Sequence, residues 1–347
     1  MTGRKVTITD RTGARRSFLS PAGARILHAG LLEGIGLPHE CGTGTCGMCK
    51  AKLETGEIDD LWAEAPGRKS CRRRGEILMC QSAAAGDVDL SLRADFTPPP
   101  EPSCQALSGV LRPLDRPTPD IARVRCTLEA PLRFDAGQFV LVEIPGVAGP
   151  RAWSMTNHTN GRELDFLLRR APGGAASEAI FERLTGEVVV TVTGPLGRAI
   201  FDPAERRPFI AIAGGSGIAG MLAIAARAAE AAAYGPHGSD IVFGLRDPGS
   251  AYLLEDLDTM ASAAALRITV AFSENADGLT PEAWPNLAFT RGFAHEAAAD
   301  AVKLAQARGD RPIHYVAGPP VMVDATLRAL MAAHAVAAED IRYDRFG

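Results

Sequence analysis

Three cysteines stand among three glycines in the stretch "ECGTGTCGMCK", residues 40–50. Their spacing is Cys41-x4-Cys46-x2-Cys49, and Cys80 follows later in "ILMCQS". Thiolates are strong ligands for iron and zinc, and glycine neighbours let a chain wrap closely around a metal centre. The residue types and their spacing therefore predict a four-thiolate metal site.

The same spacing is that of plant-type [2Fe-2S] sites. Two irons need two thiolates each, and Cys41, Cys46, Cys49 and Cys80 supply this number. The glycines of the loop leave room for the inorganic core and provide backbone N–H groups that can point at its sulfurs. We therefore expect these four cysteines to bind a [2Fe-2S] cluster.

Two alternatives stay open at this stage. A structural zinc ion also takes four cysteines, although such sites usually pair two Cys-x2-Cys hooks, whereas here one partner is single and distant. Cys71 in "RKSCRRRG" is a rival fourth ligand. Cys80 is favoured because it follows an apolar strand and precedes a polar turn, which would return it to the loop. Cys71, Cys104 and Cys126 are then incidental thiols.

A run of basic residues lies between the cysteine loop and Cys80: Arg68, Lys69, Arg72, Arg73 and Arg74. Such a run is usually a solvated surface. Because it is close to the expected cluster, the alternative is a docking surface for an acidic redox partner.

The composition sets wider limits. A length of 347 residues suggests two or three domains, and 46% hydrophobic with 22% charged residues is typical of a soluble globular protein. The net charge of -4 does not indicate the basic surface that nucleic-acid binding requires. No apolar run reaches the roughly 18 residues of a membrane span, and the N-terminus lacks the core of a signal peptide. We therefore expect a cytoplasmic protein, and the odd cysteine count in so long a chain argues against a disulfide framework.

The chain divides at a proline-rich segment, "DFTPPPEPSCQA", which we expect to be an extended linker over residues 95–106. Before it, residues 1–94 begin with a hairpin, "KVTITD" and "RRSFLS", followed by a helix in "GARILHAGLLEGI". After it, residues 107–205 show short apolar or alternating strands between Gly and Pro turns, as small antiparallel β-barrels do. Residues 206–347 alternate apolar strands with Ala-rich helices, which predicts a Rossmann-like parallel α/β domain.

The tetrapeptide "RAWS", residues 151–154, resembles the Arg-x-Tyr-Ser signature of the ferredoxin–NADP reductase family, with Trp153 in place of tyrosine. The resemblance implies an FAD site in the barrel. Arg151 would pair with the FAD pyrophosphate, Trp153 would lie on the isoalloxazine, and Ser154 would approach flavin N5; the last two are the candidate catalytic residues. Ordinary barrel packing is the alternative for Trp153.

The segment "PGGAASEAIF" leads from Gly173 and Gly174 into a helix whose first turn includes Ser177. Helix N-termini attract anions, and by resemblance this helix would also hold the flavin pyrophosphate. A plain loop and cap is the alternative.

A glycine-rich loop, "GGSG", joins an apolar strand to a helix, which is the context that a dinucleotide site requires. Its residues are Gly214, Gly215, Ser216 and Gly217. Further on, "VAGPPVMV" resembles the family's Cys-Gly-Pro-Pro motif, with Gly318 and Pro319 on the nicotinamide side. Ala317 stands where the family usually has cysteine, and we expect hydride transfer to persist because the flavin and the nicotinamide carry that chemistry.

Two more positions are candidates. Arg246 follows the second strand of this half, where the adenosine ribose would lie, while the neighbouring Asp247 would favour a free 2′-hydroxyl and hence NADH. Phe346 in the ending "YDRFG" stands where relatives carry an aromatic against the flavin, and we include it among the catalytic candidates. The alternative is a residue that only closes the last strand.

Taken together, the three parts resemble the reductase components of bacterial multicomponent oxygenases along essentially the full chain. The resemblance implies a β-grasp plant-type [2Fe-2S] ferredoxin domain over residues 1–94, an FAD-binding β-barrel over residues 107–205 and a NAD-binding α/β domain over residues 206–347. The resemblance implies a relay in which NADH gives a hydride to FAD and electrons leave singly through the cluster. The partner would be a terminal oxygenase or hydroxylase, reached directly or through a separate ferredoxin. "GEIDDLWAEAPG" and "YDRFG" look most like reductases of toluene-monooxygenase-type diiron hydroxylases. Reductases of Rieske dioxygenases come second, and a redox sensor without turnover comes third.

Overall fold

The structure is a computed structural model that describes residues 3–184, 186–277 and 281–345. By its internal contacts the chain divides into two compact units. One unit comprises Met1–Gly109, Val140–Ala152 and Val190–Leu196; the other comprises Val110–Phe139, Trp153–Val189 and Gly197–Gly347. The three-domain division expected from the sequence stays a prediction.

The N-terminal part holds a mixed five-stranded sheet in the order β2-β1-β7-β3-β5. The predicted hairpin is present, because β1 and β2 pair antiparallel, whereas β1 and β7 pair parallel. The helix α1 (Ile26–Leu32) buries Ile26, Leu27 and Leu31. The strands are β1 (Arg4–Thr9), β2 (Arg15–Ser20), β3 (Lys50–Thr55), β5 (Glu76–Leu78) and β7 (Val88–Ser91), with a separate pair β4 (Ile58–Asp60) and β6 (Ser82–Ala84).

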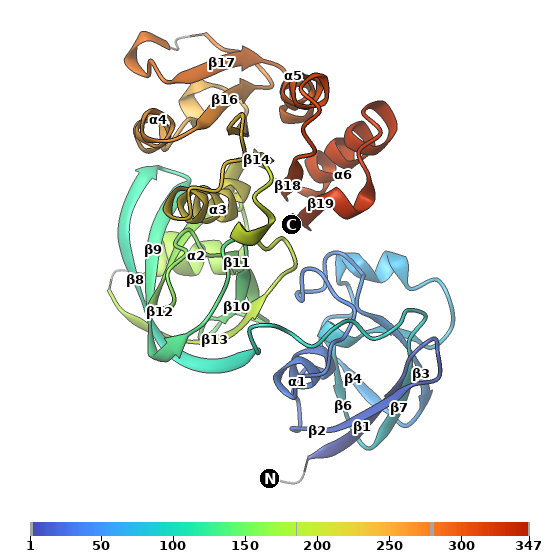
Figure 1. Cartoon of the computed structure of the whole chain (residues 1–347). Coiled ribbons are helices and arrows are strands. Elements are labelled where there is room, and N and C mark those ends of the chain that lie inside the picture. The colour runs from blue at the N-terminus through green and yellow to red at the C-terminus, as the bar shows by residue number, and fades with distance from the viewer. Residues whose placement is uncertain (1–2, 185, 278–280, 346–347) are drawn as a thin grey trace. The chain divides into compact units, whose positions relative to one another are not determined.

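The middle part is a six-stranded sheet in the order β11-β10-β13-β8-β9-β12, seen as the curved ribbons in Figure 1. Alternating burial along β9 shows that one face of the sheet covers a core. The strands are β8 (Gln105–Thr118), β9 (Ile121–Leu132), β10 (Phe139–Glu143), β11 (Arg151–Ser154), β12 (Gly161–Arg169) and β13 (Val188–Leu196). The short helix α2 (Ala175–Glu178) continues into a π-helical turn at Ala179–Arg183.

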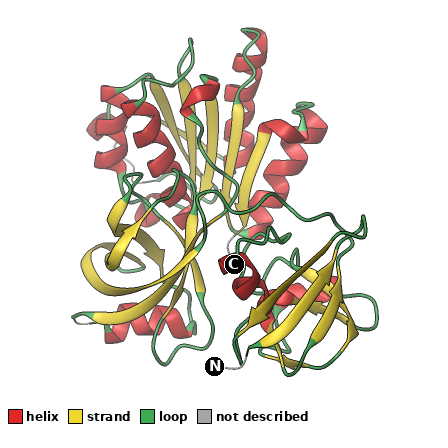
Figure 2. Cartoon of the chain, turned by 60° about the horizontal axis from the view of Figure 1, so that its bottom comes forward, coloured by secondary structure: helices red, strands yellow, loops and turns green. Residues whose placement is uncertain are grey.

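The C-terminal part is a six-stranded parallel sheet in the order β17-β16-β15-β14-β18-β19. Helices cover both faces (Figure 2): α3 and α4 pack in one apolar cluster, and α5 and α6 pack in another. The strands are β14 (Phe209–Gly214), β15 (Ser239–Leu245), β16 (Leu266–Phe272), β17 (Leu287–Arg291), β18 (Ile313–Gly318) and β19 (Ile341–Arg345). The helices are α3 (Ile218–Glu230), α4 (Leu254–Ala263), α5 (Ala294–Ala307) and α6 (Pro320–Arg328).

The strand order reverses direction at β14, which lies between β15 and β18. In open α/β sheets, ligands bind outside the carboxyl ends of the strands at such a switch point. The predicted fold class, a ferredoxin-type module, an antiparallel barrel sheet and a Rossmann-like domain, is confirmed. None of the helices in the described part of the chain has the length and apolar character that a transmembrane segment needs.

Candidate functional site

The cysteine loop depends on glycine in two ways. Gly42, Gly44 and Gly47 have φ values of 65°, 94° and 76°, which side-chain-bearing residues rarely adopt. A side-chain carbon at Gly47 would also lie 2.2 Å from the Ser70 hydroxyl oxygen, and one at Gly44 would lie 2.9 Å from Gln81. The loop can therefore close tightly only with glycine at these positions.

The four candidate metal ligands form two pairs. The Cys49 and Cys80 sulfurs are 3.2 Å apart, and the side chains of Cys41 and Cys46 are hydrogen-bonded to each other. Cys41, Cys49 and Cys80 are buried and Cys46 is half-buried. Among the described residues, no group of three or more His, Cys, Asp or Glu side chains is placed to hold a metal ion as the side chains stand. Two thiolate pairs fit a dinuclear iron–sulfur core.

Backbone donors surround the sulfurs. The N–H groups of Thr43 and Cys46 both donate to the Cys41 sulfur at 3.4 Å, and Met48 N–H donates to the Cys46 sulfur at 3.4 Å. The Cys46 thiol is the largest cause that lowers the pKa of Cys41, to about 4. Hydrogen bonding to Cys41 raises the pKa of Cys46, and Cys80 does the same for Cys49. Backbone N–H groups of the loop therefore stabilise the thiolate form of Cys41.

Cys71, the rival ligand, lies directly after the short helix Pro66–Ser70, and burial raises the pKa of its thiol. The sulfur next to Cys49 is that of Cys80. This arrangement favours Cys80 as the fourth ligand.

The basic run lies beside the cluster loop. The Ser70 hydroxyl donates to the carbonyl oxygen of Gly67 at 2.6 Å, and Gly67 N–H donates to the carbonyl oxygen of Gly44 at 2.8 Å. Arg68 pairs with Asp60. The remaining basic residues are exposed: Lys69, Arg72, Arg73 and Arg74.

One residue at the cluster loop was missed from the sequence. The Nε2 atom of His28, on α1, is 2.9 Å from the carbonyl oxygen of Gly42. Burial lowers the pKa of His28 to about 4, so the ring is neutral near pH 7. The only signal in the sequence is a histidine within the otherwise apolar "ILHAGLL".

The "RAWS" tetrapeptide forms strand β11. Arg151 donates through Nη1 to the carbonyl oxygens of Ala148, Gly149 and Pro150, at 3.1, 3.0 and 3.2 Å, and burial lowers its pKa. The Trp153 ring packs on Phe166 with centroids 5.3 Å apart, so part of its surface is used in barrel packing. All four residues of the strand are half-buried, which leaves them accessible to a ligand.

Ser154, at the end of β11, connects the barrel with the nucleotide half. Its Cβ lies 3.8 Å from the position that a side chain on Gly220 of α3 would take. The helix α3 begins directly after the glycine-rich loop. The serine proposed to face the flavin is therefore close to the helix that follows the dinucleotide loop.

The Gly-Gly segment adopts the predicted turn before a helix. Gly173 has φ 69°, and Gly174 is the N-cap residue of α2. The Ser177 hydroxyl accepts a hydrogen bond from Ala171 N–H at 2.7 Å, which closes the turn. This contact gives Ser177 a structural function in the turn beside any contact with a phosphate.

The glycine-rich loop lies at the switch point of the parallel sheet. Gly214 ends β14, and Gly215 to Gly217, including Ser216, form a short turn before α3. A side-chain carbon at Gly217 would lie 2.3 Å from the carbonyl oxygen of Ala317. One at Gly318 would lie 2.8 Å from Met322 and 3.1 Å from Gly214 N. Glycine lets the ends of β14 and β18 approach closely at this point.

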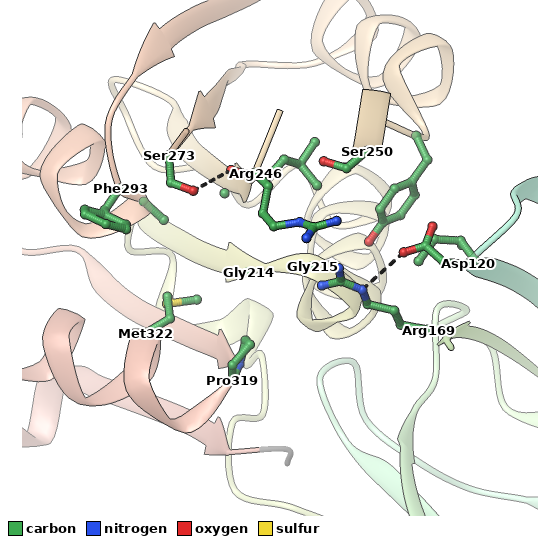
Figure 3. Close-up of a pocket in the computed structure, with 15 residues that line it drawn as sticks. Asp120, Arg169, Gly214, Gly215, Arg246, Ser250, Ser273, Phe293, Pro319 and Met322 are labelled. Atoms are coloured by element: carbon green, nitrogen blue, oxygen red, sulfur yellow. Dashed lines mark hydrogen bonds and ion pairs between the residues drawn. The ribbon is translucent and has the colours of Figure 1, made fainter. Parts of the chain in front are cut away.

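A pocket opens at these strand ends (Figure 3). Its lining includes four residues predicted from the sequence: Gly214, Gly215, Arg246 and Pro319. It also includes residues that the sequence analysis missed: Asp120, Ile121, Arg169, Gly244, Leu245, Ser250, Tyr252, Ser273, Phe293, Ala294 and Met322. Ser216, Gly217 and Gly318 lie next to this lining in the chain.

The charged lining favours an anion. Arg169 and Arg246 outnumber the single carboxylate, Asp120, which lies 3.4 Å from Arg169. In Figure 3 both guanidinium groups extend toward Gly215. Nη1 of Arg169 lies 3.2 Å from the position of a side-chain carbon on Gly215. Two arginines over a glycine loop can bind the pyrophosphate of a dinucleotide.

Tyr252 and Asp247, in the same region, differ in whether their side chains already have hydrogen-bond partners. The Tyr252 hydroxyl lines the pocket, is buried and has no hydrogen-bond partner among the described residues; burial raises its pKa. Such a group can donate to a ligand. Asp247 instead caps the turn Pro248–Ser250 by accepting from Ser250 N–H at 2.9 Å. Phe346 lies outside the described residues.

A four-thiolate loop, a barrel strand carrying Arg151, Trp153 and Ser154, and a nucleotide pocket at a parallel sheet occur in one chain. This combination defines the class of iron–sulfur flavoprotein oxidoreductases.

Comparison with known proteins gives the family. Residues 9–85 match the 2Fe-2S iron-sulfur cluster binding domain, residues 115–201 the oxidoreductase FAD-binding domain and residues 211–328 the oxidoreductase NAD-binding domain. The chain is 32% identical to the ferredoxin–NAD(+) reductase component of an alkene monooxygenase system of Xanthobacter autotrophicus, over 95% of this chain and 98% of that one. It is 33% identical to the ferredoxin–NAD(P)(+) reductase CarAd of Metapseudomonas resinovorans, over 94% and 95%.

Among solved structures, the ferredoxin reductase in carbazole 1,9a-dioxygenase is similar over 100% of both chains, with a TM-score of 0.84 and 28% identity. The chain belongs to the family of ferredoxin–NAD(P) reductase components of oxygenase systems. It is an oxidoreductase that uses a [2Fe-2S] cluster, FAD and a nicotinamide dinucleotide. The predicted resemblance, enzyme class and cofactors are confirmed.

Proposed function

We propose that this chain is the reductase component of a multicomponent diiron monooxygenase and passes electrons from NADH, through FAD and the [2Fe-2S] cluster, to the oxygenase. The observation that carries the proposal is the similarity along 95% of the chain to the reductase component of an alkene monooxygenase system. When bound, the flavin takes up a hydride from the nicotinamide, and the cluster carries single electrons.

The second candidate is the reductase of a Rieske-type dioxygenase. It is favoured by the similarity of the structure to the ferredoxin reductase in carbazole 1,9a-dioxygenase, with a TM-score of 0.84. The monooxygenase remains our first choice because of the segments "GEIDDLWAEAPG" and "YDRFG". A redox sensor without turnover is third, because the "GGSG" loop, the "RAWS" strand and all four candidate cluster cysteines are present together.

For the cluster, we propose Cys41, Cys46, Cys49 and Cys80 as the iron ligands. The support is their arrangement as two pairs, with Cys41, Cys46 and Cys49 in a glycine-rich loop whose backbone N–H groups donate to cysteine sulfurs and Cys80 beside Cys49. These residues hold the centre and keep water from it, because three of the four are buried.

For the flavin, we propose that Arg151 binds the pyrophosphate, Trp153 lies on the isoalloxazine and Ser154 lies near N5. Gly173, Gly174 and Ser177 would hold the pyrophosphate from the helix α2. The half-buried state of all residues in β11 supports this placement. Phe346 keeps its proposed function against the flavin.

For the nicotinamide nucleotide, we propose that the loop Gly214–Gly217 binds the pyrophosphate, with Gly318 and Pro319 on the nicotinamide side. Arg246 would bind the adenosine end. The pocket that joins these residues supports the proposal. Asp247 would favour the free 2′-hydroxyl of NADH, and one of its carboxylate oxygens also caps a turn. The ferredoxin–NAD(+) reductase relative supports the choice of NADH as well.

We further propose that the exposed residues Lys69, Arg72, Arg73 and Arg74 face an acidic oxygenase or ferredoxin partner, because they lie next to the cluster loop. Cytoplasmic location is also a proposal. All seven cysteines are free thiols, which suits a reducing compartment.

The experiment is an anaerobic assay of the reconstituted holoenzyme with two kinds of acceptor, a purified diiron hydroxylase and a purified Rieske oxygenase. NADH-dependent turnover of the hydroxylase supports the first choice, and turnover of only the Rieske oxygenase supports the second. Reduction of both bound cofactors without transfer to either acceptor, or to cytochrome c, would favour the sensor. NADPH in place of NADH tests the nucleotide preference.

A further inference from the structure

A histidine outside the metal ligands is bonded to the cluster loop. His28 lies in α1, is 9% exposed, and has its Nε2 atom 2.9 Å from the carbonyl oxygen of Gly42. A carbonyl oxygen can only accept a hydrogen bond, so Nε2 carries the proton and donates it. Because the ring is buried, little water competes for this bond.

The Gly42 carbonyl and the Thr43 N–H belong to the same planar peptide unit. The other end of that unit donates to a candidate iron ligand, since Thr43 N is 3.4 Å from the Cys41 sulfur. A hydrogen bond received at the carbonyl polarises the amide and strengthens the bond that its N–H donates. His28 therefore acts on the Cys41 sulfur through one peptide unit.

The peptide unit needs such a support. Gly42 has φ 65° and no side chain, so packing of its own atoms does little to fix the plane of the following peptide. The histidine, by contrast, is on a helix whose Ile26, Leu27 and Leu31 are at most 1% exposed. The helix holds the imidazole in place, and the imidazole holds the peptide.

We propose that His28 is a positioning residue that raises the reduction potential of the iron–sulfur centre through the Gly42–Thr43 peptide. The inference rests on the proposed cluster site at Cys41. Reduction adds one electron to the centre and increases the negative charge on its sulfurs. A well-aligned N–H donor stabilises that charge, so the reduced state gains more from His28 than the oxidised state does.

The test is a redox titration of the reconstituted full-length holoenzyme, followed by visible absorption and EPR. His28→Leu and His28→Met remove the donor, while His28→Gln keeps an N–H near the same position. Ile26→Val is the matched control, since it loosens the same helix without changing the hydrogen bond. We expect the donor-free variants to lower the equilibrium constant for one-electron reduction about three- to tenfold, or about 30 to 60 mV at 59 mV per tenfold.

We expect His28→Gln to stay within about twofold of the wild type and Ile26→Val to lower thermal stability without moving the potential. The proposal is overturned if the donor-free variants keep the wild-type potential, or if Ile26→Val shifts it equally. Should His28→Leu fail to fold, His28→Met provides the same comparison. Failure of the proposed cluster site is seen separately, because the wild type would then show no iron–sulfur absorption.

Discussion

The cluster loop and the nucleotide pocket are assembled in different ways. Three of the four candidate iron ligands, Cys41, Cys46 and Cys49, lie within one short loop, and the fourth completes a sulfur pair. The pocket instead collects Asp120 from the β8–β9 turn, Arg169 from β12, Arg246 from just after β15, and Met322 from helix α6. A local site can be read from residue spacing, whereas a site made from several elements depends on how these elements pack.

The cluster loop and the nucleotide loop also need glycine for different reasons. In the cluster loop, Gly42, Gly44 and Gly47 are needed for backbone conformation, since all three have positive φ. In the nucleotide loop, Gly217 is needed for space, because the carbonyl of Ala317 would touch any side chain there. Replacing a glycine of the cluster loop would strain the backbone of that single loop. Replacing Gly217 would instead force β14 and β18 apart.

The largest effect is expected for Cys80→Ser. Loss of one thiolate from a pair should abolish the iron–sulfur absorption and lower electron transfer to cytochrome c by more than about tenfold. Hydride transfer from NADH to FAD, followed at the flavin band by anaerobic stopped-flow, should be unchanged. Cys71→Ser is the control and should keep the absorption; the opposite result would make Cys71 the ligand.

The next effect is expected for Gly217→Ala. A Cβ 2.3 Å from the Ala317 carbonyl oxygen should push β14 and β18 apart and destabilise the fold by about 1–3 kcal/mol. The KM for NADH should rise while the iron–sulfur absorption remains. Gly161→Ala is the control, because nothing lies within 4 Å of its Cβ position. Equal thermal denaturation of the two variants would contradict the steric account.

Arg169 tests the part of the pocket that spacing did not predict. Removing a guanidinium from a pyrophosphate site costs about 1.5–3 kcal/mol, so Arg169→Ala should raise the Kd of NADH roughly tenfold or more. The measurement is titration calorimetry with the holoenzyme. Arg170→Ala is the neighbouring control, since Arg170 pairs with Glu182 and does not line the pocket. If both variants bound NADH with the Kd of the wild type, the assignment of this pocket to NADH would be wrong.

The smallest effect is expected on the surface beside the cluster. Arg72→Glu combined with Arg73→Glu should slow transfer to an acidic acceptor a few-fold at low salt, and the difference should vanish at high salt. Stopped-flow rates at several ionic strengths measure this. Arg308→Glu, another exposed arginine, serves as control. A salt-independent loss, or an equal loss in the control, would show that these cations do not steer the partner.

Much of the fold could be predicted from the sequence, because apolar strands such as "FIAIAG" alternate with Ala-rich helices and "KVTITD" with "RRSFLS" forms a hairpin. The cysteine pattern predicted Cys80 as a fourth ligand, and the structure places its sulfur 3.2 Å from that of Cys49. Arg169 was missed because its position over Gly215 depends on the packing of β12 against the nucleotide loop. The cap that Asp247 forms with Ser250 was also missed, because the pattern of charges does not reveal a short-range hydrogen bond of this kind.

The central claim is that one chain carries electrons from a nicotinamide nucleotide to a four-thiolate iron–sulfur centre. Anaerobic addition of NADH to the reconstituted holoenzyme, followed by visible absorption and low-temperature EPR, tests it most directly. We predict bleaching of the flavin bands together with the signal of a reduced [2Fe-2S] cluster, and loss of that signal alone in Cys80→Ser. Bleaching of the flavin in the wild type with a cluster that stays oxidised would contradict the account.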